Sequence, residues 1–152
     1  MRIEELEVVC QEAARNVVLR EPRPLRVSVV LPLPTKTSVN TLAEWPDEDA
    51  ARLELLERFA DDVMRPNNAP CFGFVAEGVA DSPDGPVDVV VVAFGARGNH
   101  PRISAAPLSS DGLGEFLPSE SLAPAAMPFL APLQLAADAA KPPDAFGAPV
   151  SG

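Results

Sequence analysis

The feature that most limits the fold of this chain is a series of three β-type segments, at residues 71–80, 87–95 and 102–108. They are joined by two short connections rich in Asp, Gly and Pro, and connections this short join antiparallel neighbours. The middle segment carries valine on both faces. We therefore predict that it lies inside the sheet with both faces covered and with Val91 buried.

The remaining elements are predicted from their periodicity. Residues 25–31 alternate apolar and polar side chains, as a strand with one covered face does. Apolar residues at helical spacing favour helices at 2–18, 46–65 and 132–140, and residues 35–41 are predicted to be a polar connection. The predicted fold class is α+β: a mainly antiparallel sheet of about four strands, packed with two longer helices and one short C-terminal helix.

Length and charge limit the organisation and the partners. The 152 residues are enough for one domain, predicted at 1–140, and the stretch 141–152 lacks apolar periodicity and is predicted to be a flexible tail. Twelve basic against 22 acidic residues leave a net charge of −10, which argues against binding to nucleic acid or to an anionic membrane. The basic residues are mostly arginine, which is typical of proteins from GC-rich bacterial genomes.

Cysteine usage and the acidic start of the chain favour a reducing, cytoplasmic setting. Cys10 and Cys71 are too few for a disulfide framework, and Cys10 falls on the apolar stripe of the first helix, where it is predicted to be a small buried residue. No apolar run is long enough to span a membrane.

Common catalytic motifs are absent from the sequence. It contains no Gly-x-Ser-x-Gly nucleophile turn, no phosphate-binding Gly-rich loop and only one histidine, which excludes a three-histidine zinc site. We therefore expect no cofactor and no metal, and we favour a protein that is not an enzyme.

The sequence offers two candidate anion- or partner-binding sites. Arg97, His100 and Arg102 place two guanidinium groups and the single imidazole within six residues, in a part of the chain that is otherwise acidic. Lys36 lies among threonine and serine hydroxyl groups and forms the second candidate. The alternative interpretation of both is an ordinary solvated loop.

Glu77 and Asp88 form a further candidate site, because they fall on neighbouring segments near the same turn. If both faced the core, repulsion between the two carboxylates would raise a pKa, as at many catalytic sites. The alternative is that both are solvated.

The segment 122–135 is apolar and uncharged, so it must be buried against the domain or against another chain. Its candidate interface residues are Met127, Phe129, Leu130 and Leu133. We expect a non-catalytic interaction protein, such as an adaptor, inhibitor, or immunity- or chaperone-like partner, which binds another protein or a second copy through this segment. The alternative is a small-molecule or anion-binding domain, or a small enzyme, with its site near the 97–102 turn.

Overall fold

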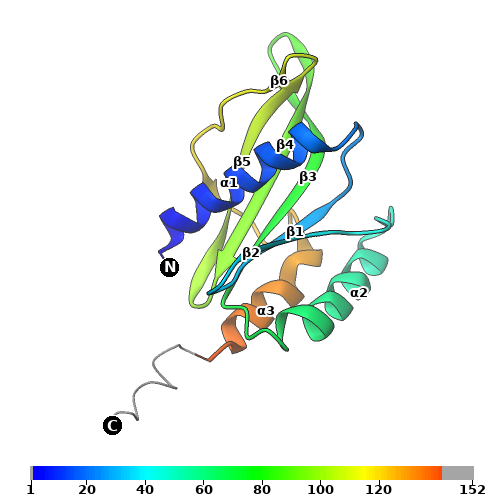
Figure 1. Ribbon diagram of the computed structural model, residues 1–152. Helices are drawn as coiled ribbons and strands as arrows, with labels where there is room; N and C mark the ends of the chain where they lie inside the picture. Colours follow the sequence, from blue (N-terminus) through cyan, green and yellow to red (C-terminus); the bar gives the residue numbers. More distant parts are fainter. Residues whose placement is uncertain (1, 142–152) are drawn as a thin grey trace.

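The structure is a computed structural model that describes residues 2–141, and it confirms the α+β class with a largely antiparallel sheet (Figure 1). Six strands follow one another across the sheet in the order β2-β1-β3-β4-β5-β6, and a seventh, β7, pairs with β5. The strands are β1 (Ser28–Pro32), β2 (Thr37–Thr41), β3 (Cys71–Ser82), β4 (Gly85–Ala96), β5 (Asn99–Ser109), β6 (Gly112–Leu113) and β7 (Glu120–Ser121).

Helices cover both faces of the sheet. Helix α1 (Ile3–Arg20) crosses one face and lies in front in Figure 1. Helix α2 (Asp49–Phe59), the π-helical turn Ala60–Met64 and helix α3 (Ala131–Ala139) cover part of the other face. Each face therefore has its own buried apolar core.

The alternation of β3 explains why there are two cores. Phe72 and Phe74 point into the core beneath α2 and α3, whereas Cys71 and Val75 point into the core beneath α1. Successive side chains of a strand point to opposite faces, so one strand contributes to both layers.

The prediction of about four strands was too low, chiefly because residues 37–41 form strand β2 rather than a polar connection. The turn Leu33–Lys36 folds this segment back onto β1, with Val39 opposite Val30. Side chains at 37, 39 and 41 are β-branched, which suits a strand, and Pro32 ends β1 without ending the sheet. The short strands β6 and β7 were also missed.

The helix lengths differ from the prediction. The first helix continues to Arg20, the α-helical part of the predicted 46–65 helix is Asp49–Phe59, and the last helix follows a 3-10 turn at Pro128–Leu130. Of the acidic residues after Pro46, Asp47 and Glu48 precede the helix, and only Asp49 lies in its first turn. Most of the predicted tail, residues 142–152, lies outside the described residues.

The valine strand is interior, as predicted. β4 pairs with β3 on one side and β5 on the other, and Val90 and Val92 are fully buried beneath α1. Val91 points to the opposite face and is only partly buried, which corrects the prediction for this residue. It lies beyond the area that α2 and α3 cover, beside a surface cleft.

Candidate functional site

A surface cleft opens on the sheet face that α2 and α3 cover only in part. It has a volume of about 420 Å³, within the usual size range of small ligand sites. Its walls are the segment just before β1, the segment after β2 and the 127–129 turn, and its floor is the sheet. We call it the Trp45 cleft, after the aromatic residue on its wall.

Three aromatic side chains form one wall of the Trp45 cleft. The ring centroid of Trp45 lies 5.4 Å from that of Phe74 and 5.2 Å from that of Phe129, and the Phe74 and Phe129 centroids are 5.7 Å apart. These separations are typical of favourable tilted and edge-to-face aromatic pairs. The residues come from three separate parts of the chain, so only the tertiary fold brings them together.

Arg52 of α2 lies against this aromatic wall. Its guanidinium carbon is 5.1 Å from the Trp45 ring centroid and 5.6 Å from that of Phe129, within the range of cation–π contacts. Its Nε donates to the Pro46 carbonyl oxygen, and its Nη1 lies 3.8 Å from the Asp49 carboxylate. These contacts hold the indole and the start of α2 in one arrangement.

The floor of the cleft consists of small side chains on β3 and β4. Ala76, Gly78 and Val91 line it, and all three are partly exposed. A Cβ atom added at Gly78 would meet only a methyl group of Val91, at 3.8 Å, so the space above this glycine is open. The cleft exists because no large side chain rises from the sheet here.

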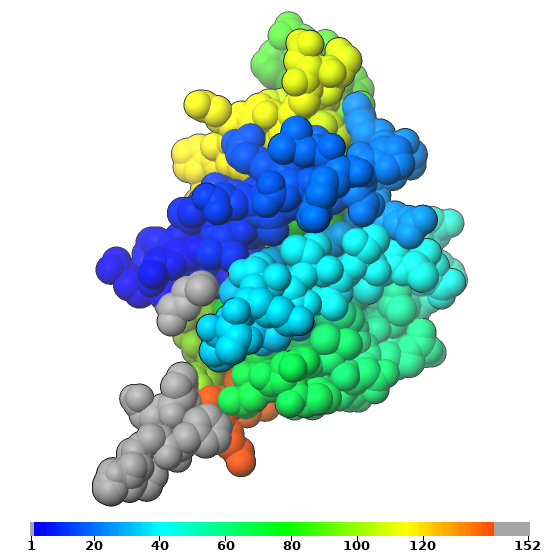
Figure 2. All heavy atoms as spheres, viewed as in Figure 1, coloured from blue at the N-terminus to red at the C-terminus, as the bar shows by residue number. Residues whose placement is uncertain are grey.

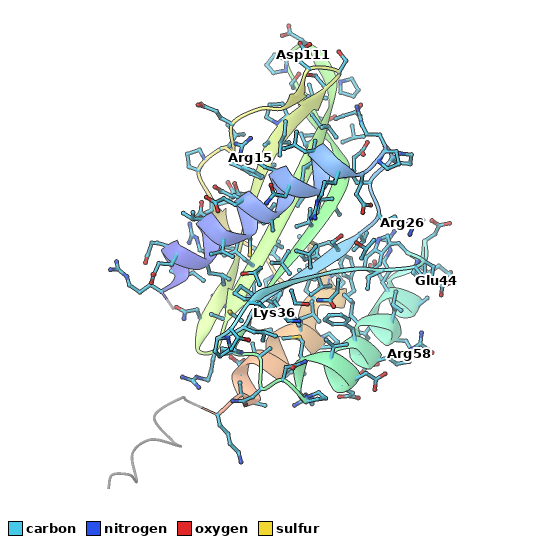
Figure 3. The ribbon with its side chains drawn as sticks, viewed as in Figure 1. Arg15, Arg26, Lys36, Glu44, Arg58 and Asp111 are labelled. Atoms are coloured by element: carbon cyan, nitrogen blue, oxygen red, sulfur yellow. The ribbon has the colours of Figure 1, made fainter. Side chains whose placement is uncertain are left out.

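Four acidic residues flank Trp45 along the chain. Glu44, Asp47, Glu48 and Asp49 are all exposed, and Glu44 also lines the cleft. We call these four residues the carboxylate rim. Figure 3 shows Glu44 and Arg26 at the same side of the molecule; Arg26 lines the cleft and is exposed. The site thus combines an aromatic wall with two acidic and two basic lining residues, Glu44, Glu77, Arg26 and Arg52, and the chain segment that flanks Trp45 adds three further exposed carboxylates.

The three groups of the predicted 97–102 site are not gathered in one place. Arg97 donates from Nη1 to the Ala140 carbonyl oxygen at the end of α3, at 3.1 Å. Arg102 donates to Ser119, with its Nη2 2.7 Å from the backbone oxygen, and Ser119 in turn donates to Glu7 of α1. The Arg97 guanidinium group therefore contacts the α3 side of the sheet, whereas the Arg102 guanidinium group contacts the α1 side.

The turn itself is also tighter than predicted, because β5 begins at Asn99. His100 is exposed at the edge of an apolar groove of about 270 Å³. Gln134, Leu135 and Met127 line this groove as well. Anion binding by His100 and its neighbours stays a prediction.

Lys36, the second predicted site residue, is exposed in the turn before β2 and is not among the residues that line the Trp45 cleft. Its predicted role in partner binding stays a prediction.

The apolar 122–135 segment packs largely into the chain's own core. Phe129, Leu130 and Leu133 are buried beneath the sheet, and Met127 is partly buried between the cleft and the apolar groove. The apolar character of the segment is therefore explained within one chain. Self-association through it stays a prediction that no contact in the structure tests.

Glu77 and Asp88 share a cation instead of forming an unpaired acidic pair. Nη2 of Arg23 donates to Glu77 Oε2 at 2.8 Å and to Asp88 Oδ2 at 3.0 Å. The hydrogen bond from Arg23 lowers the pKa of Glu77, which is the opposite of the raised pKa expected for a catalytic acid. The pair fixes the connection between α1 and β1.

Both cysteines are buried, which confirms the prediction for Cys10. Burial raises the pKa of Cys10 to about 12 and that of Cys71 to about 11. A thiol with so high a pKa is protonated at neutral pH and is a poor nucleophile. Neither cysteine supports catalysis.

Residues 2–141 contain no group of three or more His, Cys, Asp and Glu side chains arranged to hold a metal ion. None of the helices described is both long and apolar enough to cross a membrane. The chain matches no protein-family model, and comparison with curated proteins and with solved structures finds no significant match.

The Trp45 cleft was not predicted from the sequence. The available signal was the single tryptophan placed directly before Pro46 and an acidic helix start. An aromatic residue there is also expected to pack on the first turns of the helix, so this signal does not distinguish a helix contact from a binding wall.

Proposed function

We propose that this protein is a non-catalytic binding protein that accepts an apolar side chain of a protein partner in the Trp45 cleft. The observation that carries the proposal is the aromatic wall of Trp45, Phe74 and Phe129 beside an open floor of small residues. Aromatic walls supply large contact areas at little entropic cost, and an apolar anchor in a pocket is the usual centre of a protein interface.

The carboxylate rim indicates the chemistry of the partner. Four exposed carboxylates within four residues of Trp45, in a chain of net charge −10, attract a basic partner and speed its association. Arg52 is already held by the aromatic rings, Pro46 and Asp49. We therefore propose that the anchor is an aromatic side chain flanked by lysine or arginine.

Trp45 makes the proposal directly testable, because it is the single tryptophan and the chain has no tyrosine. Tryptophan emission therefore reports on the cleft wall alone. We expect a saturable emission change when the capped peptide Lys-Lys-Phe-Lys-Lys is added. We expect a much weaker change with Glu-Glu-Phe-Glu-Glu, because the carboxylate rim repels it, and with Lys-Lys-Ala-Lys-Lys, because it lacks an anchor.

A matched pair of variants locates the response. Val91→Phe fills the floor of the cleft and is expected to weaken the response to Lys-Lys-Phe-Lys-Lys at least about tenfold, which corresponds to about 1.4 kcal/mol. Val79→Phe adds the same ring at an exposed position of β3 outside the cleft and is expected to leave the response unchanged. Equal responses to the Phe and Ala peptides, or no effect of Val91→Phe, would refute the proposal.

A further inference from the structure

Strand β2 forms an open edge of the sheet. It pairs with β1 on one side, and no other strand of residues 2–141 pairs with its outer side. Figure 2 shows the cyan segment that contains β2 at the surface, beside the blue atoms of α1. The opposite edge of the sheet is different, because β6 and β7 pair with β5.

The register identifies which backbone groups face outward. Leu33 donates to the Lys36 carbonyl, and Leu42 donates to the Val27 carbonyl. Hydrogen-bonded and non-hydrogen-bonded pairs alternate in an antiparallel ladder, so Ser38 and Asn40 bond to β1. The N–H and C=O groups of Thr37, Val39 and Thr41 therefore point away from the sheet.

The β2 edge lacks the devices that usually prevent strand pairing. Residues 37–41 contain no charge and no proline, and no bulge interrupts the pairing with β1. Natural edge strands commonly carry a central lysine, a proline or a bulge to discourage pairing. The groove beside Thr37 and Val39 holds one acidic and one basic side chain of α1, Glu12 and Arg20, so the charges nearest this edge balance even though the chain has a net charge of −10.

The edge is also complementary to itself. An antiparallel pairing about a two-fold axis at Val39 places Val39 opposite Val39 of the second copy, and Thr37 opposite Thr41 of the second copy. Cross-strand threonine pairs and β-branched pairs are favourable. Every outward N–H and C=O group of the strand then finds a partner.

The charges at the two ends of β2 fit the same register. Figure 3 shows Lys36 and Glu44 at opposite ends of this segment, and both are exposed. The two-fold axis places Lys36 opposite Leu42 of the second copy, two residues from its Glu44. Long side chains reach such a diagonal neighbour, so each end of the pairing gains one Lys36–Glu44 contact.

We propose that two copies of this chain associate through antiparallel pairing of their β2 strands across a two-fold axis at Val39, with Lys36 and Glu44 fixing the register. This surface is separate from the apolar 122–135 segment, and the proposal does not depend on ligand binding in the Trp45 cleft.

The first test is a charge swap read out by sedimentation or light scattering across about 1 µM to 1 mM protein. The wild type is expected to change from 16.0 kDa to twice that mass as concentration rises. Lys36→Glu and Glu44→Lys each place like charges together at both ends and are expected to weaken the dimer about tenfold at low salt. The double variant K36E/E44K reverses both charges and is expected to recover the wild-type affinity.

Matched controls separate this contact from an effect of net charge. Lys141→Glu and Glu57→Lys make the same exchanges at exposed positions away from β2 and are expected to leave the dimer affinity unchanged. Recovery in the double variant cannot arise within one chain, because β2 alone separates the two side chains by about 13 Å. A 16.0 kDa monomer at every concentration, or single variants that dimerise like the wild type, would overturn the proposal.

Amide hydrogen exchange gives a second test with an internal control. The amides of Thr37, Val39 and Thr41 are expected to gain protection as protein concentration rises through the dimer range. The amides of Ser38 and Asn40 already bond to β1 and are expected to exchange at the same rate throughout. A dimer in which the first three amides gain no protection would place the interface elsewhere and overturn the proposal.

Discussion

Arg23 Nη2 lies 2.8 Å from Glu77 Oε2, so the segment that follows α1 is tied to the middle of β3. The other carboxylate oxygen of Glu77 accepts a hydrogen bond from the Leu25 amide, at 3.1 Å. One carboxylate thereby holds both a side chain and the backbone of the α1–β1 connection. This connection also forms part of the Trp45 cleft, because Leu25 and Arg26 line it.

The Arg23–Glu77 contact makes stability depend on pH in acid. The pKa of Glu77 is lowered in the folded state, first by the hydrogen bond from Arg23, from its ordinary value of 4.5. A lowered folded-state pKa contributes stability that is complete above the unfolded-state pKa and is lost as the pH falls through the folded-state value. Glu77→Gln is therefore expected to cost about 1 kcal/mol at pH 7 and progressively less below pH 4.5.

Urea unfolding of the wild type and Glu77→Gln at several pH values measures this difference. Asp88→Asn is a useful comparison, because Asp88 is more exposed and accepts only from Arg23 among the residues described, so we expect a smaller effect. A difference between wild type and Glu77→Gln that stays constant from pH 7 to about pH 3 would contradict the assignment.

Neighbouring valines of β4 are expected to respond very differently to a charge. Val92→Asp buries a carboxylate beneath α1 without a partner and is expected to destabilise the fold by more than about 3 kcal/mol. Val91→Asp places the same carboxylate beside the Trp45 cleft, where water reaches it, and is expected to cost clearly less. Thermal or urea unfolding of both variants decides the order, and equal losses would show that the cleft floor is not open to water.

This pair of residues also shows how far sequence reasoning reaches. Alternation along 71–108 was sufficient to predict three antiparallel strands and the interior position of the valine strand. It could not show that α2 and α3 leave the region above Val91 uncovered, because helix placement depends on tertiary packing. The residues around Trp45 were missed for the same reason, since Phe74 and Phe129 reach the indole from distant parts of the chain.

The same limit explains the interpretation of the 97–102 region. The sequence places Arg97, His100 and Arg102 close together along the chain, but Arg97 lies in the turn before β5 and bonds to Ala140 of the α3 end. Arg102 lies on β5 and bonds to Ser119, so the two arginines contact different parts of the fold. For β2, the β-branched residues were visible, but nothing local indicated that the chain turns back after Pro34 to pair with β1.

Leu133 and Leu135 of α3 provide a matched test of where the apolar 122–135 segment packs. Leu133 is fully buried in the core beneath the sheet, whereas Leu135 is 62% exposed. Leu133→Ala is expected to cost about 3 kcal/mol in the free energy of unfolding, and Leu135→Ala close to zero. If Leu133→Ala left the unfolding midpoint unchanged, the segment would not pack as described.

The contact between Gly73 and Cys10 sets how closely α1 approaches the sheet. A Cβ atom at Gly73 would collide with Cys10 Sγ, and it would also press on the Cβ atoms of Cys10 and Val30, at 3.2 and 3.4 Å. Gly73→Ala is therefore expected to destabilise the fold by about 2 kcal/mol, because α1 or β3 must shift. Cys10→Ala removes the sulfur atom, so the double variant is expected to lose less stability than the sum of the two single losses. A double-mutant cycle from urea unfolding measures this coupling, and additive losses would show that the sulfur does not limit the approach of the helix.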